Sequence, residues 1–129
     1  MLTIRPEQLE VFREQRDHAF VDRLIEHLRQ HHTGTVLGIA DEVLRQRVTF
    51  GIERARTYGL SWESSIGGFV ALQFVIAPRF DEQPGIHRIL TDPSKPPDER
   101  IGGLSELIAA DDWFEATTDA PLSHWPEEM

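Results

Sequence analysis

Six histidines are the first residues in this chain that could do chemistry, and two of them have the spacing of metal ligands. His27 and His31 lie four residues apart, so on a helix both imidazoles would face the same side and could meet one zinc ion. A zinc site needs three or four converging ligands, and neither H-E-x-x-H nor paired E-x-x-H motifs occur. We interpret this segment as a solvated helix end. A small metal-binding or hydrolytic enzyme that uses His27 and His31 is the alternative.

Paired acidic residues are the second candidate for catalysis. The doublets are Asp41-Glu42, Asp81-Glu82, Asp98-Glu99 and Asp111-Asp112. Adjacent side chains on a helix point about 100° apart, so a doublet does not form a two-carboxylate site by itself. The chain has no cysteine, and it lacks both a phosphate-binding glycine loop and a G-x-S-x-G motif. We therefore predict that the chain is not an enzyme, and we assign no catalytic residue, metal ligand or cofactor.

The elements that position these residues are predicted to be helices, in an all-α, single-domain bundle. Apolar residues recur at steps of three and four in four segments, at about 6–31, 37–58, 62–77 and 97–115, and a short helix fits 85–91. The third segment contains FVALQFVIAP and is apolar on nearly all sides, which places it at the centre of the bundle. We prefer a helix to a strand there because no partner strand accompanies it. It is also shorter than the roughly 20 apolar residues of a membrane span.

Two residues predict how these helices begin and meet. Gly51 lies inside the second helix, where glycine costs about 1 kcal/mol relative to alanine, so it indicates a close helix–helix approach. Ser61 precedes the central helix and is expected to cap its N-terminus.

Aromatic residues are the remaining functional candidates. Phe80 lies in a loop from which it is expected to reach the core, and Trp113 and Trp125 lie near the C-terminus. Tryptophan is enriched in the hot spots of protein interfaces. We take Phe80, Trp113 and Trp125 as candidate partner-binding residues.

The net charge of −9 comes entirely from the second half of the chain. Residues 1–60 contain nine acids and nine bases, whereas residues 61–129 contain thirteen acids and four bases. Nucleic-acid binding requires a basic face, so we do not expect a nucleic acid as the partner. Because the longest apolar stretch is too short to span a bilayer, we do not expect a membrane either. No secretory signal is visible, which favours a cytoplasmic location.

We expect one helical domain, 1–115, and an acidic, flexible C-terminal tail, 116–129. The oligomeric state stays open.

Several motifs together resemble a family of small bacterial proteins. They are I-R-P-E-Q-L at 4–9, F-V-D-R at 20–23, L-R at 28–29, G-I-E-R-A-R-x-Y-G-L at 51–60, F-V-A-L-Q-F-V at 69–75 and P-R-F-D at 78–81. Over about residues 4–110 the pattern is similar to the small helical proteins encoded in type VI secretion clusters, beside VgrG spike genes, toxic effectors and adaptor chaperones. The family usually has a glycine before the Phe-Asp pair, where this chain has Pro78-Arg79.

The resemblance implies a non-catalytic accessory or co-chaperone role in loading an effector onto the spike. Its implied partner is an adaptor chaperone, an effector or the VgrG spike, and it transfers no catalytic residue to this chain. A further alternative is an immunity protein that neutralises a secreted toxin through the acidic second half, in which case salt would weaken its binding.

Overall fold

The structure is a computed structural model that describes residues 6–104, 116–117 and 125, with side chains from residue 16 onward. The elements are α1 (Pro6–His31), α2 (Thr33–Val36), α3 (Asp41–Thr57), α4 (Glu63–Val75), the short 3-10 helix η1 (Phe80–Glu82), α5 (Pro84–Leu90), α6 (Pro97–Arg100) and a second 3-10 helix, η2 (Ile101–Gly103). The described residues contain no strand, which confirms the all-α prediction. None of the described helices is both long enough and apolar enough to cross a membrane.

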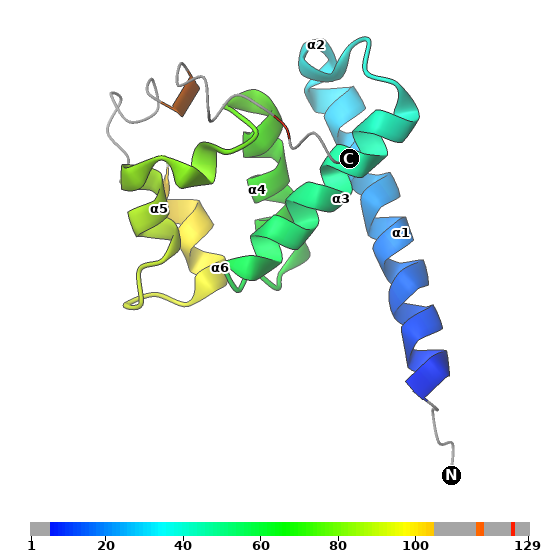
Figure 1. Cartoon of the computed structure of the whole chain (residues 1–129), viewed down its shortest axis with the longest axis horizontal. Coiled ribbons are helices and arrows are strands. Elements are labelled where there is room, and N and C mark those ends of the chain that lie inside the picture. Colours follow the sequence, from blue (N-terminus) through cyan, green and yellow to red (C-terminus); the bar gives the residue numbers. More distant parts are fainter. Residues whose placement is uncertain (1–5, 105–115, 118–124, 126–129) are drawn as a thin grey trace.

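Helix α4 is the central element, as its apolar sequence predicts. It packs most extensively on α3 and also contacts α1, α2 and η2. Figure 1 shows α1 along one side of the molecule and α5 and α6 on the other, with α3 and α4 between them. The N-terminal half of α1 projects beyond the other helices (Figure 1). The fold is therefore a helical body with one helix extending from it.

The core draws buried apolar side chains from α1 to α5, from η1 and from Leu104 after η2. The largest fully buried apolar side chains are Phe69, Phe80, Leu28, Leu44, Ile86, Leu90, Leu104, Val36, Val48 and Val70. The rings of Phe69 and Phe80 lie 5.0 Å apart, and the ring of Tyr58 lies 5.8 Å from that of Phe69. Burial of a phenylalanine side chain stabilises a fold by about 1.5–3 kcal/mol. The expected placement of Phe80 in the core is confirmed, and it fixes η1 against α4.

Gly51 permits the close packing of α3 on α4. A Cβ atom built at this position would lie 2.2 Å from Gln73 Oε1 and 3.0 Å from Val70 Cγ2. At those distances any side chain at position 51 would require its neighbours, Gln73 above all, to move. The predicted close approach at Gly51 is confirmed.

Helix boundaries differ from the predicted ones mainly around α3. The predicted helix 37–58 begins at Asp41, because Leu37 has an extended backbone and Gly38 has a φ of 83°. Both conformations interrupt a helix. Val36 belongs to α2 and is buried.

The C-terminal helix follows its prediction only at its start. It begins at Pro97, as predicted, but the backbone changes to 3-10 geometry at Ile101–Gly103, where two consecutive glycines weaken an α-helix. The rest of the predicted helix, 105–115, lies outside the described residues. The bounds of α1, α4 and α5 agree closely with the helices predicted at 6–31, 62–77 and 85–91.

The start of α4 is capped by a residue from α6. The N-cap is Trp62, whose own side chain makes no capping bond, so the prediction that Ser61 caps this helix is wrong. The backbone N–H groups of Ser61 and Trp62 donate to Asp98 Oδ1 at 2.9 and 2.8 Å. The Ser61 hydroxyl donates to Asp98 Oδ2 at 2.8 Å, and the Ser65 hydroxyl donates to the Asp98 carbonyl oxygen at 3.0 Å. Asp98 thus ties the C-terminal segment to the central helix.

These hydrogen bonds determine the charge state of Asp98. Partial burial acts to raise the pKa of its carboxyl group, but donation from Trp62, Ser61 and Ser65 outweighs burial and lowers the pKa below its usual value of 3.8. The carboxylate of Asp98 is therefore ionised in the folded protein at neutral pH.

Candidate functional site

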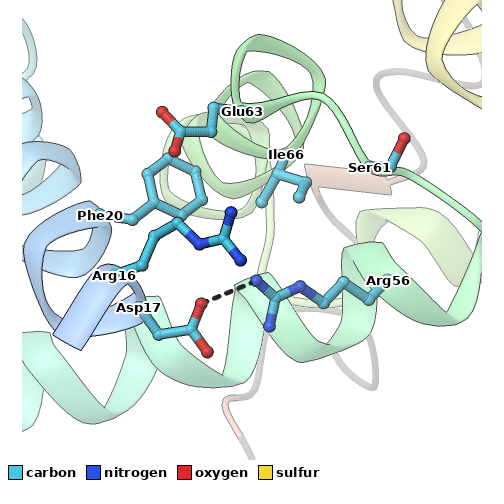
Figure 2. A pocket seen from close by; sticks show the side chains of 7 residues that line it. All are labelled: Arg16, Asp17, Phe20, Arg56, Ser61, Glu63 and Ile66. Atoms are coloured by element: carbon cyan, nitrogen blue, oxygen red, sulfur yellow. Dashed lines mark hydrogen bonds and ion pairs between the residues drawn. The ribbon is translucent and has the colours of Figure 1, made fainter. Parts of the chain in front are cut away.

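Two adjoining hollows between α1 and α4 form the clearest candidate site. The first, of about 350 Å³, is lined by Arg16, Asp17, Phe20, Arg56, Ser61, Glu63 and Ile66 (Figure 2). The second, of about 460 Å³, is lined by Phe20, Arg23, Leu24, His27, Glu63, Ser64, Gly67, Gly68 and Ala71. Because both are lined by Phe20 and Glu63, we treat them as one feature, the α1–α4 groove. Each volume falls in the range of about 300–1,000 Å³ typical of binding pockets.

Small residues of α4 shape the floor of the groove. Gly67 lies close to α1, since a Cβ atom there would be 3.2 Å from Leu24 Cδ2. Gly68 and Ala71 continue the same lining along α4, and Phe20 contributes from α1. The absence of bulky side chains at these α4 positions leaves the groove open. The floor of the second hollow is therefore built mostly of small residues of α4 and apolar side chains of α1.

Charged residues that pair across the helices form the rim. Arg23 on α1 reaches Glu63 on α4, with its Nη2 atom 3.0 and 2.9 Å from the two carboxylate oxygens. Arg56 on α3 pairs with Asp17 on α1 at 3.0 Å, as the dashed line in Figure 2 marks. Both side chains of the Arg23–Glu63 pair are 56% exposed. Exposed pairs contribute only about 0–1 kcal/mol, so they can exchange partners when another surface docks.

Arg16 supplies an additional positive charge to the groove. Its guanidinium lies beside that of Arg56 over the first hollow (Figure 2). Among the residues whose side chains are described, Arg16 makes no ion pair, whereas Arg56 and Arg23 pair with Asp17 and Glu63. The described rim thus has one more positive than negative charge. The apolar lining of the second hollow and the unpaired guanidinium at the first suit a segment that carries apolar side chains and a carboxylate.

A second cluster of polar residues surrounds the buried carboxylate of Asp81. Asp81 is 0% exposed, and its Oδ2 atom accepts from Arg54 Nε at 2.7 Å and from the Tyr58 hydroxyl at 2.7 Å. The Tyr58 hydroxyl also lies 3.3 Å from His87 Nδ1. The second oxygen, Asp81 Oδ1, has no hydrogen-bond partner among the described residues. The cluster links α3, η1 and α5.

The ionisation of this cluster favours a structural role. Burial, followed by the hydrogen bond to Asp81 and the charge of Asp81, raises the pKa of Tyr58 above its usual value of 10.0. Burial lowers the pKa of Arg54, but the neighbouring Asp81 outweighs burial and raises it. The phenol therefore stays protonated and donates, and the guanidinium stays charged. None of these residues lines the α1–α4 groove, so the cluster holds η1 against α3 rather than facing a ligand there.

Three of the six histidines, His27, His31 and His32, gather at the C-terminal end of α1. The rings of His27 and His31 lie 4.6 Å apart, and the ring of His32 lies 5.9 Å from that of His27. His27 and His31 are exposed. Within the described part of the chain, no group of three or more histidine, aspartate, glutamate or cysteine side chains could hold a metal ion. The spacing seen in the sequence does bring two imidazoles together, without the third ligand that a zinc site needs.

The predicted partner-binding aromatics have different surroundings. Phe80 is 0% exposed, so its side chain belongs to the core and not to the surface on which a partner would dock. Trp125 is half-buried and lies against Phe74, with ring centroids 4.9 Å apart. Trp113 lies outside the described residues. Trp62 is 55% exposed beside the groove-lining Ser61 and Glu63.

The acidic doublets also divide among separate roles. Asp41 pairs with Arg29, Asp81 with Arg54, and Asp98 caps α4. Asp111-Asp112 lies outside the described residues. In each described doublet the first acid has its own partner from another helix, so the doublets do not act as two-carboxylate sites.

Sequence reasoning missed the residues that build the groove. Arg23 and Glu63 lie forty positions apart, and no local motif connects them. The only signal available was Gly67-Gly68 inside an otherwise apolar helix, since glycine in a helix often marks a close approach of another chain segment.

Comparison with known proteins identifies no relative: no family model, curated protein or solved structure matches this chain.

Proposed function

We propose that this protein is a non-catalytic accessory protein that binds a protein partner through the α1–α4 groove. The observation that carries the proposal is the groove itself, two adjoining hollows of which the second has a mostly apolar lining, with a rim of exposed ion pairs. Interfaces between proteins combine a low-charge centre with a polar rim in this way.

The sequence resemblance suggests which partner to test first. Its motifs are similar to those of small helical proteins encoded in type VI secretion clusters, so the proposed partner is an adaptor chaperone, an effector or the VgrG spike. The proposed role is to assist effector loading in the cytoplasm. It requires a complementary surface and no reactive group.

The groove also specifies the chemistry of the docking segment. A helix or extended peptide would place small or apolar side chains over Gly68 and Ala71, and a carboxylate near Arg16. The carboxylate would meet a guanidinium that has no ion-pair partner among the described side chains. This charge-assisted contact with Arg16 favours an aspartate or glutamate at one end of the partner segment.

The experiment is an isothermal calorimetric titration of the purified chain with an adaptor chaperone, an effector and a VgrG spike protein, one at a time. Two substitutions block the groove at residues outside the apolar core. They are Ser64→Arg, at an exposed position, and Ala71→Arg, about two turns further along α4. Each should weaken binding at least about tenfold, because a long charged side chain would occupy the channel.

Gln46→Arg is the matched control. It adds the same side chain at an exposed position of α3 that does not line the groove, and it should bind like the unsubstituted chain. The proposal fails if neither the adaptor chaperone, the effector nor the VgrG spike binds the chain. It also fails if the Ser64→Arg and Ala71→Arg variants bind the partner as tightly as Gln46→Arg does.

A further inference from the structure

Trp125 occupies a small aromatic site on α3 and α4 that shares no residue with the α1–α4 groove. Its ring lies 4.9 Å from that of Phe74 on α4 and 6.4 Å from that of Phe50 on α3, the latter in an edge-to-face arrangement. The guanidinium carbon of Arg47 lies over the indole, 5.2 Å from the ring centroid. Two aromatic rings and one cation therefore surround a single indole.

This arrangement has the composition of a recognition site rather than of the core. Arg47, Phe50, Phe74 and Trp125 are all only half-buried, in contrast to the fully buried Phe69 and Phe80. Tryptophan and arginine are the residues most enriched in interface hot spots, and a cation over an indole is the strongest of the cation–aromatic pairs. The site thus combines a shape that fits an indole with partial access to solvent.

We propose that Arg47, Phe50 and Phe74 form a recognition site for a tryptophan-bearing peptide segment, which the chain's own Trp125 occupies in the free protein. We call these three residues the indole site. The structure itself demonstrates that an indole fits, since Trp125 contacts all three side chains. A partner that carries a tryptophan on an exposed segment would bind the same site by displacing Trp125.

The neighbourhood of the indole site supports its use in docking. Val75 follows Phe74 and is 47% exposed, and Val43 lies one helical turn before Arg47 and is 37% exposed. An incoming segment could therefore extend its apolar contacts beyond the indole along both helices. Because Trp125 is part of the same chain, its high effective concentration makes it a competitor for any peptide added in trans.

The test uses a labelled peptide with the sequence of residues 117–129 and the full-length chain carrying Trp125→Ala. Fluorescence polarisation should show saturable binding of the peptide to Trp125→Ala and at least about tenfold weaker binding to the unsubstituted chain, whose own Trp125 fills the site. The same peptide with alanine in place of its tryptophan should not bind.

Two further substitutions place the binding at the indole site. Phe74→Ala in the Trp125→Ala chain should weaken the peptide about tenfold, and Arg47→Gln should weaken it severalfold, because it removes the cation–aromatic contact. Arg47 is half-buried and is not part of the apolar core, so Arg47→Gln keeps the fold intact if Phe74→Ala does not. Arg88→Gln, on the exposed side of α5, is the matched control and should bind like the parent. The inference is overturned if the peptide does not bind Trp125→Ala, or if the alanine peptide binds equally well. It is also overturned if Arg47→Gln and Arg88→Gln behave alike.

Discussion

Substitution of Gly51 by alanine tests the packing of α3 on α4 most sharply. In an exposed helix this change stabilises by about 1 kcal/mol, because alanine is the better helix former. Here the new Cβ would lie 2.2 Å from Gln73 Oε1, so the Gln73 side chain would have to move. Gln73 is buried and its Nε2 atom donates to the Pro78 carbonyl oxygen at 3.1 Å. Any movement therefore acts on both packing and a buried hydrogen bond.

The magnitude follows from these opposing effects. Overpacking of a dense core costs about 1–3 kcal/mol, and a weakened buried hydrogen bond costs about 1 kcal/mol more. Together they exceed the gain in helix propensity of about 1 kcal/mol. We expect Gly51→Ala to lower the free energy of unfolding by about 1–3 kcal/mol. Urea unfolding followed by circular dichroism measures it.

Gly34→Ala is the matched control. Gly34 lies in α2, and nothing lies within 4 Å of the position its Cβ would take. The same substitution should there be neutral or stabilising by up to about 1 kcal/mol. The packing argument is refuted if Gly51→Ala is as stable as the unsubstituted chain, or if both substitutions have the same effect. In a Gln73→Ala background, where Oε1 is absent, Gly51→Ala should cost clearly less.

Two further predictions concern ionisable groups. Asp98→Ala removes the carboxylate that caps α4 and should cost about 1 kcal/mol of unfolding free energy at neutral pH. Because the folded-state pKa of Asp98 is lowered below 3.8, its contribution is full above that value and is lost as the pH falls through the folded pKa, so acid titration of both proteins should show their stabilities converging. Equal stability at neutral pH would contradict the cap. Tyr58 is the only tyrosine, and its raised pKa predicts phenolate absorption appearing above pH 10.0, with stability falling as the pH rises beyond that value. Asp81→Asn should bring the titration closer to 10.0; an unchanged titration would show that Asp81 does not control Tyr58.

The helices could be predicted from the sequence because their signals are local. Three- and four-residue spacing located α1, α4 and α5, and Gly51 indicated the tight contact of α3 with α4. The break before α3 was missed because its cause is the backbone geometry of Leu37 and Gly38, neither of which excludes a helix by residue type alone.

The groove and the polar links could not be predicted, because each joins residues far apart in the chain. Asp98 reaches back to Ser61 and Trp62, and Arg23 reaches forward to Glu63. A cap normally comes from the residue at the start of its own helix, which is why Ser61 was the natural choice. Nothing near Asp98 in the sequence indicates that its carboxylate serves α4 as well as the start of α6.

Amide hydrogen exchange, measured with and without the bound adaptor, effector or spike protein, tests the central claim most directly. If the partner docks in the α1–α4 groove, the amides of this chain should be better protected from exchange over two segments. These are residues 16–27 of α1 and residues 61–71 at the start of and along α4, which contain most of the groove lining. The added protection should be lost in Ser64→Arg and kept in Gln46→Arg. Protection confined to α5 and α6, with these two α4 and α1 segments unchanged, would contradict the assignment of the groove as the binding surface.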